Sequence, residues 1–253
     1  MKRVLILIGC LLSLSLYCAV SLADPLPLLE DYAENIVFPY DEENPDGGVF
    51  VYSFRYPHPD ETAPGGSGIN VFYQDLIDYT LNFTVPLFQD AFEGADSSTV
   101  VTYSVTCNND DFFSVLIRTD RSNPDQSLTL WEGHVFSRAH GSAGYTYTLP
   151  KLLGLLSPDD NEEWLQDFQT EKTDQLIRDM VWDLIEENAD DINYGNLTRE
   201  SLSAVFFPEE SFYLDENGDP VFYLQPGDVY ESVPEGAALL TFPLSLEDIR
   251  DEL

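Results

Sequence analysis

Three consecutive strand-like runs in the middle of the chain constrain its fold more than any other feature. They span Thr99–Cys107, Phe112–Thr119 and Leu128–Arg138, and they are rich in β-branched and aromatic residues. Two short polar segments, Asn108–Asp111 and Asp120–Gln126, separate them. Connections this short join antiparallel neighbours, because a parallel pair needs a crossover of about a dozen residues or more. The runs therefore predict an antiparallel meander.

Helical periodicity appears on both sides of the meander. Apolar residues recur at helical spacing between Ile69 and Phe92. Pro86 is expected to kink or end this helix in its last turns, because proline lacks the backbone donor that a helix needs. A second helix is predicted at Glu162–Asn188. Its apolar stripe consists of Trp164, Phe168, Leu176, Ile177, Met180, Val181, Leu184 and Ile185.

The other predicted elements are short. We expect strands at Val49–Arg55, Gly144–Leu149 and about Ala238–Leu244, a helix that starts near Thr198, and a hairpin at Phe212–Leu224. The order strand, helix, strands, helix, strands is typical of an α+β fold. The predicted architecture is one or more antiparallel sheets covered by two main helices.

Composition divides the chain into four segments. Residues 1–23 are almost wholly apolar after a basic start, and residues 24–48 form an acidic, proline-rich lead-in that we interpret as a linker or a loosely packed segment. Residues 49–150 and 151–253 are predicted to form an N-terminal and a C-terminal α+β half. We expect the two halves to pack intimately and to meet near Pro150.

The first segment predicts a secretory signal peptide. Lys2-Arg3 supplies the basic start, Val4–Val20 the apolar run, and Ser21-Leu22-Ala23 a cleavage site before Asp24. Two alternatives stay open. Cys10 could be lipidated, although only six residues precede it in the apolar run, or the run could stay uncleaved as a short membrane anchor. Each alternative predicts a secreted or extracytoplasmic protein, with the cell surface as a variant.

Charge limits the partners that the mature protein can have. The chain has 46 acidic and 11 basic residues, a net charge of −35, and loss of the signal peptide removes two basic residues and no acidic one. Such a charge repels nucleic acid and anionic lipid and favours cations or a basic protein. We predict no nucleic-acid partner, and membrane contact only through an uncleaved or lipidated N-terminus.

No motif in the chain assigns a reaction or a cofactor. Glu132 and His134 share one face of a predicted strand, but the spacing supplies no third metal ligand. Cys107 is interpreted as a small buried hydrophobe. Pairs of carboxylates suited to glycan hydrolysis arise by chance among 46 acids, so a cell-wall glycan hydrolase is the alternative to a binding protein.

The predicted hairpin carries a family resemblance. Phe212–Pro226 resembles the Phe-Tyr-Leu…Val-Phe-Tyr…Gln-Pro signature of a family of bacterial extracytoplasmic domains, found in RsiV-like lysozyme-sensing anti-sigma factors and PdaC-like peptidoglycan deacetylases. Arg138–Gly141 resembles the family's Gly-Ala-His-Gly turn. Gly236 and Phe242–Leu244 are similar to its following Gly and closing strand. The resemblance spans roughly Val49–Leu244.

The chain departs from the family pattern at two places. Gly227 stands where the family usually has Tyr, and Leu149-Pro150-Lys151 replaces a Thr-Gly-Lys turn. A deacetylase module would need an Asp and two His on a separate domain. A sigma-binding segment would need residues before the apolar run, where Met1–Arg3 stand. The resemblance therefore implies an extracytoplasmic domain without an effector.

The resemblance implies binding rather than catalysis. RsiV-like members bind lysozyme, a strongly basic protein, and the acidic charge of this chain suits such a partner. We predict a non-catalytic domain that recognises lysozyme or a cell-wall-associated protein. The candidate contact residues, in the hairpin and in the loop after the third run, are Arg138, His140, Asp215, Asn217, Asp219 and Tyr223.

Two features leave a third class open, an acidic calcium binder in a lumenal or extracellular space. Asp215, Asn217 and Asp219 repeat the first half of a calcium loop, although Pro220 occupies the position of its glycine. The last four residues, Arg250–Leu253, resemble an endoplasmic-reticulum retrieval signal. We interpret that ending as chance, because the family resemblance points to bacteria.

Overall fold

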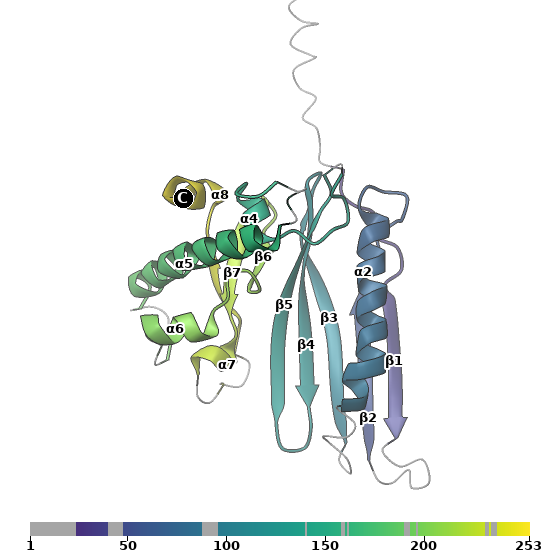
Figure 1. Ribbon diagram of the computed structural model, residues 1–253. Helices are drawn as coiled ribbons and strands as arrows, with labels where there is room; N and C mark the ends of the chain where they lie inside the picture. The colour runs from purple at the N-terminus through teal and green to yellow at the C-terminus, as the bar shows by residue number, and fades with distance from the viewer. Residues whose placement is uncertain are drawn as a thin grey trace, which may run out of the picture.

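The computed structural model describes most of the chain after the predicted signal peptide. The described residues are 24–39, 48–87, 96–139, 141–157, 160, 162–189, 193–195, 197–230, 233 and 237–253. The signal peptide with Cys10, and the candidate residue His140, lie outside these ranges. Within the ranges, no helix has the length and apolar character that crossing a membrane requires. The fold is α+β, with a five-stranded and a three-stranded sheet (Figure 1).

The larger sheet contains the predicted meander on one side. The antiparallel pairing of its last three strands is confirmed. The pair formed by the second and third strands is parallel instead, because a helix crosses between them. In order across the sheet, the strands are β1 (Tyr32–Pro39), β2 (Val49–Tyr56), β3 (Ser97–Asn108), β4 (Phe112–Ser122) and β5 (Ser127–Ser137).

Strand β1 lies inside the segment 24–48 that we interpreted as loosely packed. It pairs with β2 in antiparallel register along all of its 8 residues. Its side chains Tyr32, Ile36 and Phe38 pack against the buried core. The interpretation was wrong for residues 32–39, because the surrounding prolines and acids dominate the composition and hide a short alternating pattern.

The crossover from β2 to β3 contains helix α2 (Gly66–Tyr79), which continues as the π-helical turn η2 (Thr80–Thr84). The backbone N–H of Val85 donates to Thr80 O, five residues back. This distortion lies directly before Pro86, which cannot continue the regular helical hydrogen bonds. Residues 85–87 are again helical, and the rest of the predicted helix lies outside the described residues.

The first core lies between α2 and one face of the larger sheet (Figure 1). Helix α2 contributes Ile69 and Tyr73, both fully buried. The strands contribute alternate residues, because every second side chain of a strand points to the same face. These residues are Phe50, Tyr52, Phe54 and Tyr56 of β2, Val101 of β3, Phe113, Val115 and Ile117 of β4, and Phe136 of β5.

A β-bulge lets β3 contribute to a second core on the opposite face of the sheet. Val105 pairs with Val115, and the next paired residue of β3 is Cys107, opposite Ser114. The extra residue shifts the alternation by one position, so the Cys107 side chain points away from the first core. Burial of Cys107 in the second core confirms its interpretation as a small hydrophobe, and burial raises the pKa of its thiol to about 11.

The smaller sheet encloses the second core. Its antiparallel strands are β6 (Phe212–Leu214), β7 (Pro220–Leu224) and β8 (Leu240–Pro243), which confirms the predicted hairpin and last strand. The strand predicted at Gly144–Leu149 is wrong. Thr146 forms one isolated bridge with Phe136, and a helix begins at Leu149, because the next residue is a proline suited to a first helical turn.

Five helices accompany the smaller sheet among the described residues. They are α4 (Leu149–Leu152), α5 (Glu163–Glu187), α6 (Arg199–Val205), α7 (Pro226–Val229) and α8 (Leu246–Glu252). The helix expected near Thr198 is α6, and the Thr198 side chain accepts a hydrogen bond from Ser201 N as its N-cap. Helices α7 and α8 were not predicted, although Ser245 and Asp248 carry the spacing of a helix start before α8.

Helix α5 confirms the second predicted helix and the C-terminal part of its apolar stripe, from Leu176 to Ile185, which packs against the second core. Trp164 and Phe168, which we placed on the apolar stripe, are 66% and 59% exposed. They precede the part of the helix that packs against the second core. The buried residues of α5 are Thr173, Asp174, Ile177, Val181 and Ile185.

Candidate functional site

The polar turn of the hairpin is held by its own side chains. Asp215 Oδ1 accepts hydrogen bonds from the backbone N–H groups of Asn217 (2.8 Å) and Asp219 (3.0 Å). Asp219 Oδ1 in turn accepts one from Leu246 N at 2.9 Å, at the start of α8. Both carboxylates therefore stabilise the turn and the neighbouring helix, and the Asn217 side chain is exposed.

Arg138 binds backbone groups inside the protein. The residue is 7% exposed, and its Nη1 donates hydrogen bonds to Asp24 O at 2.9 Å and to Asn109 O. Asn109 also borders the hairpin turn, because a Cβ added to Gly218 would lie 3.6 Å from Asn109 Nδ2. Arg138 is therefore an interior residue. It lies close to the hairpin turn, and Asn109 contacts both.

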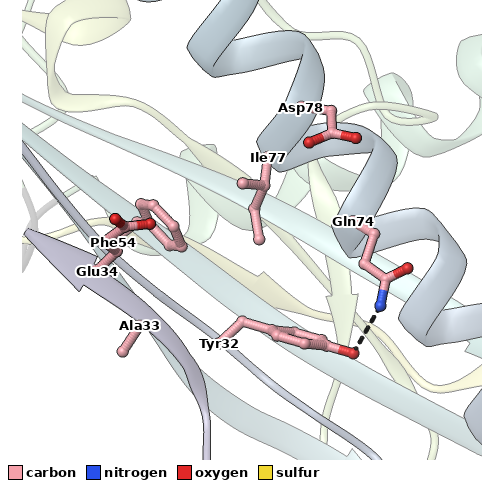
Figure 2. A pocket seen from close by; sticks show the side chains of 7 residues that line it. All are labelled: Tyr32, Ala33, Glu34, Phe54, Gln74, Ile77 and Asp78. Atoms are coloured by element: carbon pink, nitrogen blue, oxygen red, sulfur yellow. Dashed lines mark hydrogen bonds between the residues drawn. The ribbon is translucent and has the colours of Figure 1, made fainter. Parts of the chain in front are cut away.

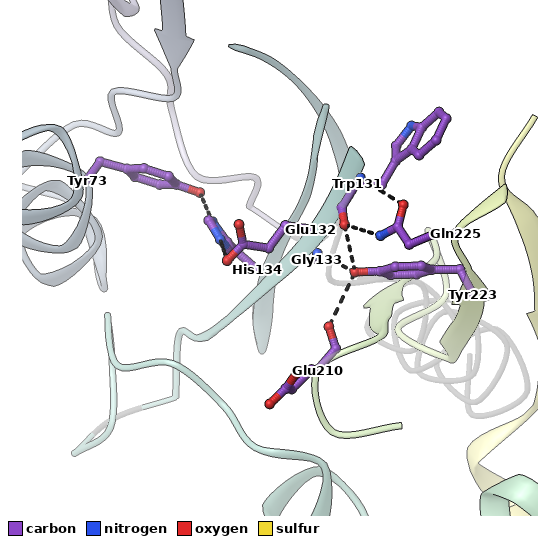
Figure 3. A network of polar contacts seen from close by, with 8 residues as sticks. All are labelled: Tyr73, Trp131, Glu132, Gly133, His134, Glu210, Tyr223 and Gln225. Atoms are coloured by element: carbon purple, nitrogen blue, oxygen red, sulfur yellow. Dashed lines mark hydrogen bonds and ion pairs between the residues drawn. The ribbon is translucent and has the colours of Figure 1, made fainter. Parts of the chain in front are cut away.

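Tyr223 is 2% exposed and belongs to a polar network (Figure 3). Its Oη accepts a hydrogen bond from Gly133 N at 3.0 Å and donates to Glu210 O at 3.3 Å. Gln225 adds two bonds, because its Oε1 accepts from Trp131 N (3.1 Å) and its Nε2 donates to Trp131 O (2.6 Å). These bonds join the end of β7 to the outer edge of β5.

The two sheets approach each other closely at Gly133. A Cβ at this position would lie 1.9 Å from Phe212 O, so any other residue would force the sheets apart. Our sequence analysis did not single out Gly133 or Gln225 as junction residues. The available signals were an isolated glycine inside a predicted strand and the Gln-Pro of the family signature.

A second polar chain lies on the other face of β5 (Figure 3). His134 Nε2 lies 3.0 Å from Glu132 Oε1, and His134 Nδ1 lies 3.2 Å from Tyr73 Oη on α2. The hydrogen bond from His134 lowers the pKa of Glu132, and burial raises the pKa of Tyr73 well above its ordinary value. These polar contacts link α2 to β5. Among the described residues, no group of three or more His, Cys, Asp and Glu could hold a metal.

A groove of about 750 Å³, here called the junction groove, lies where the two sheets meet. Strands β4 and β5 form one wall, and Tyr213, α7 and residues 237–239 lie opposite. Arg118 stands over the Trp131 ring, 6.0 Å from its centroid, and forms an ion pair with Asp120 at 2.9 Å. The described residues that line the groove include no Asp or Glu, so they supply no carboxylate pair for glycan hydrolysis.

A smaller pocket of about 420 Å³ lies between β1 and α2 (Figure 2). Gln74 Nε2 donates a hydrogen bond to Tyr32 Oη at 3.0 Å and ties the helix to the edge strand. The pocket also contains Glu34 of β1, and Ile77 and Asp78 of α2. The pocket therefore lies where α2 covers the β1 edge of the larger sheet.

The exposed first turns of α5 form an acidic and aromatic surface. This α5 face consists of Trp164, Asp167, Phe168 and Glu171. Their spacing of three or four residues places them on one side of the helix. Trp164 Nε1 donates to Glu162 Oε2 at 2.8 Å. Residues 160–172 include five acids and one base, Lys172, so exposed aromatic rings lie within a predominantly negative surface.

Comparisons with known proteins find similarity only at the level of solved structures. No family model matches the chain, and no curated protein matches it. A DUF3298 family member from Bacteroides fragilis is 11% identical, with a TM-score of 0.48, over 89% of this chain and 93% of that chain. A DUF3298 family protein from Pseudomonas aeruginosa is 12% identical, also with a TM-score of 0.48, over 89% and 93%. These neighbours belong to a family of unknown function, and the RsiV/PdaC-like resemblance stays a prediction.

Proposed function

We propose that the mature chain is a non-catalytic binding domain that acts outside the cell and recognises a basic protein, lysozyme or another cell-wall-associated protein. The observation that carries this proposal is the α5 face, where Trp164 and Phe168 are exposed among acids. Exposed aromatic residues with a charged surround are typical of protein–protein interfaces. The negative charge of the chain adds attraction at a distance.

In this proposal the α5 face replaces the hairpin turn as the main contact surface. The Asp215 and Asp219 carboxylates accept hydrogen bonds within the chain, whereas the side chains of Asp167 and Glu171 form neither a hydrogen bond nor an ion pair with any described residue. Their charges are therefore available to a partner. Asn217, exposed at the hairpin turn, stays a predicted secondary contact.

The two kinds of side chain have different effects on binding. Burial of the Trp164 and Phe168 rings supplies most of the affinity, because aromatic residues dominate the binding energy of protein interfaces. The acids mainly raise the association rate, and salt screens them over about 8 Å at 0.15 M. Binding should therefore weaken in salt but persist.

Calorimetric titration of the mature chain, Asp24–Leu253, with lysozyme tests the proposal at low salt and at about 0.15 M salt. We expect saturable one-to-one binding in both conditions. A double variant, Trp164→Ala with Phe168→Ala, should bind at least about tenfold more weakly, a loss of about 1.4 kcal/mol.

The matched control is the double variant Tyr79→Ala with Phe83→Ala. These two rings have the same four-residue spacing and are each 61% exposed, on α2 and η2. The control should bind as the unmodified chain does. Equal losses in the two double variants, or binding that vanishes at 0.15 M salt, would contradict a dedicated surface on α5.

A further inference from the structure

The outer edge of β5 is hydrogen-bonded along most of its length. Its odd-numbered residues direct their backbone groups away from β4, because these groups alternate sides along an antiparallel strand. Four successive odd-numbered residues have partners at this edge. The pairs are Ser137 with Gly144 and Tyr145, Val135 with Tyr147, Gly133 with the Tyr223 hydroxyl, and Trp131 with the Gln225 side-chain amide.

Between Trp131 and the β4–β5 turn, the same edge has no hydrogen-bond partner among the described residues. Thr129 and Ser127 are the next two odd-numbered residues, and both line the junction groove. In the described part of the chain, no hydrogen bond involves their outward backbone N–H and C=O groups. The Thr129 hydroxyl points elsewhere and donates to Asp120 Oδ1 at 2.6 Å.

Gln225 shows what kind of group this edge accepts. Its amide makes both a donor and an acceptor bond with the Trp131 backbone, as the peptide group of a neighbouring strand would. The junction groove begins where this pairing ends, so it continues an interface that the fold already contains. The opposite wall is small and apolar, with Pro226, Gly227 and residues 237–239.

We propose that the junction groove binds an extended peptide segment of a partner protein, which adds as a strand to β5 at Thr129 and Ser127. Main-chain hydrogen bonds to these two residues would hold the peptide, as in other cases of strand addition. Alternate apolar side chains would contact Trp131 and Tyr213. The edge from Trp131 to Ser127 is about 13 Å long, the length of four or five extended residues.

The apolar wall favours a peptide over a glycan. The charged group in the described lining is Arg118, which Asp120 already pairs at 2.9 Å. A glycan would need several free polar side chains around an aromatic platform, whereas a peptide uses the free backbone groups of the edge. The proposal is independent of the α5 face and of lysozyme, because the two surfaces share no residue.

Selection from a phage-displayed library of random decapeptides tests the proposal, with the secreted protein as bait. Selected peptides are synthesised and titrated by calorimetry into the unmodified protein and two variants. Thr129→Pro removes the outward N–H and the hydroxyl, and an edge strand tolerates proline whose N–H faced outward. Thr129→Ala removes the hydroxyl and the γ-methyl group but keeps the outward N–H. We expect at least a tenfold loss of affinity with Thr129→Pro and less than a threefold loss with Thr129→Ala.

Hydrogen exchange of the unmodified protein supplies a readout that needs no variant. The amides of Thr129 and Ser127 should exchange at least tenfold more slowly when a selected peptide is bound. Failure to enrich any peptide, equal losses in the two variants, or unchanged exchange at these amides would overturn the proposal. Displacement of the peptide by chitin oligosaccharides would assign the groove to glycans instead.

Discussion

The side chains of Tyr223 and Gln225 bond to the backbone of β5 along its outer edge. The Tyr223 hydroxyl accepts from Gly133 N and donates to Glu210 O, so one oxygen connects three segments of the chain. Desolvation raises the pKa of Tyr223, so the hydroxyl keeps its proton for the bond that it donates. The residue that we predicted as a ligand contact therefore joins the two sheets.

Replacement of Tyr223 by Phe should destabilise the protein. The change leaves the ring in place but removes the hydroxyl that bonds to Gly133 N and Glu210 O; both bonds are partly buried, so we expect a loss of about 1 kcal/mol. Urea denaturation followed by circular dichroism measures the loss. Tyr145→Phe is the control, because Tyr145 is 72% exposed, and its stability should match that of the unmodified protein. A neutral Tyr223→Phe would contradict a role for the hydroxyl in holding the sheets.

Helix α4 begins at a half-buried carboxylate. Glu209 Oε2 accepts a hydrogen bond from Leu149 N at 3.1 Å, at the first residue of α4. Burial raises the pKa of Glu209 to about 7, and the nearby charge of Asp174 adds to the shift. Burial likewise raises the pKa of Asp174, against the attraction of Arg178. The contact between α4, α5 and the segment before β6 therefore carries a group that titrates near neutral pH.

Glu209 should make the protein less stable as pH rises from about 4.5 to about 7. Its pKa is 4.5 unfolded and about 7 folded, so the folded state binds more protons in this window. The stabilisation is complete below the unfolded pKa and is lost as pH rises through the folded pKa. The variant Glu209→Gln, which stays neutral, should exceed the unmodified protein in stability at pH 8 by on the order of 2 kcal/mol, and the excess should shrink towards pH 4.5.

Urea unfolding at several pH values measures this difference. Glu216→Gln is the control, because Glu216 is exposed at the hairpin turn. Its stability difference from the unmodified protein should not depend on pH across the window. A Glu209→Gln difference that is equally flat would show that Glu209 titrates at its ordinary pKa in the fold.

The folded protein holds a large negative charge in a compact volume. The chain has 46 acids and 11 bases, a net charge of −35. Folding brings these acids closer together than in the unfolded chain, so their repulsion opposes the compact state. The two hydrophobic cores, on opposite faces of the larger sheet, must exceed this repulsion.

Salt should therefore stabilise the protein. Between about 0.01 M and 0.15 M salt, the Debye length falls from about 30 Å to about 8 Å, and repulsion between distant acids is screened. We expect the melting temperature to rise by several degrees over this range. The melting temperature of a variant with Asp167 and Glu171 changed to amides should rise less over the same range of salt, because the variant carries less negative charge. A melting temperature that is flat or falls with sodium chloride would contradict self-repulsion.

Local periodicity predicted the elements whose pattern depends on neighbours in sequence. The meander of β3, β4 and β5, the C-terminal hairpin and helix α5 were all predicted from alternation, turn residues or helical spacing. The same reasoning missed β1, because its pattern is short and lies among prolines. It also put the exposed Trp164 and Phe168 on the same apolar stripe as the buried residues of α5, because a period identifies an apolar stripe but not the part of it that another element covers.

The sequence by itself determined the acidic charge, the α+β class and most strands and helices, because these depend on composition and on residues close along the chain. Only the tertiary structure decided which faces are buried and which site residues reach solvent. Gln225 meets Trp131 across 94 residues and Tyr223 meets Gly133 across 90. No local pattern encodes such pairs, because they form only when two sheets with separate patterns pack together. For that reason Arg138 and Tyr223 lie inside the fold, and the exposed acids and aromatics of α5 lie outside it.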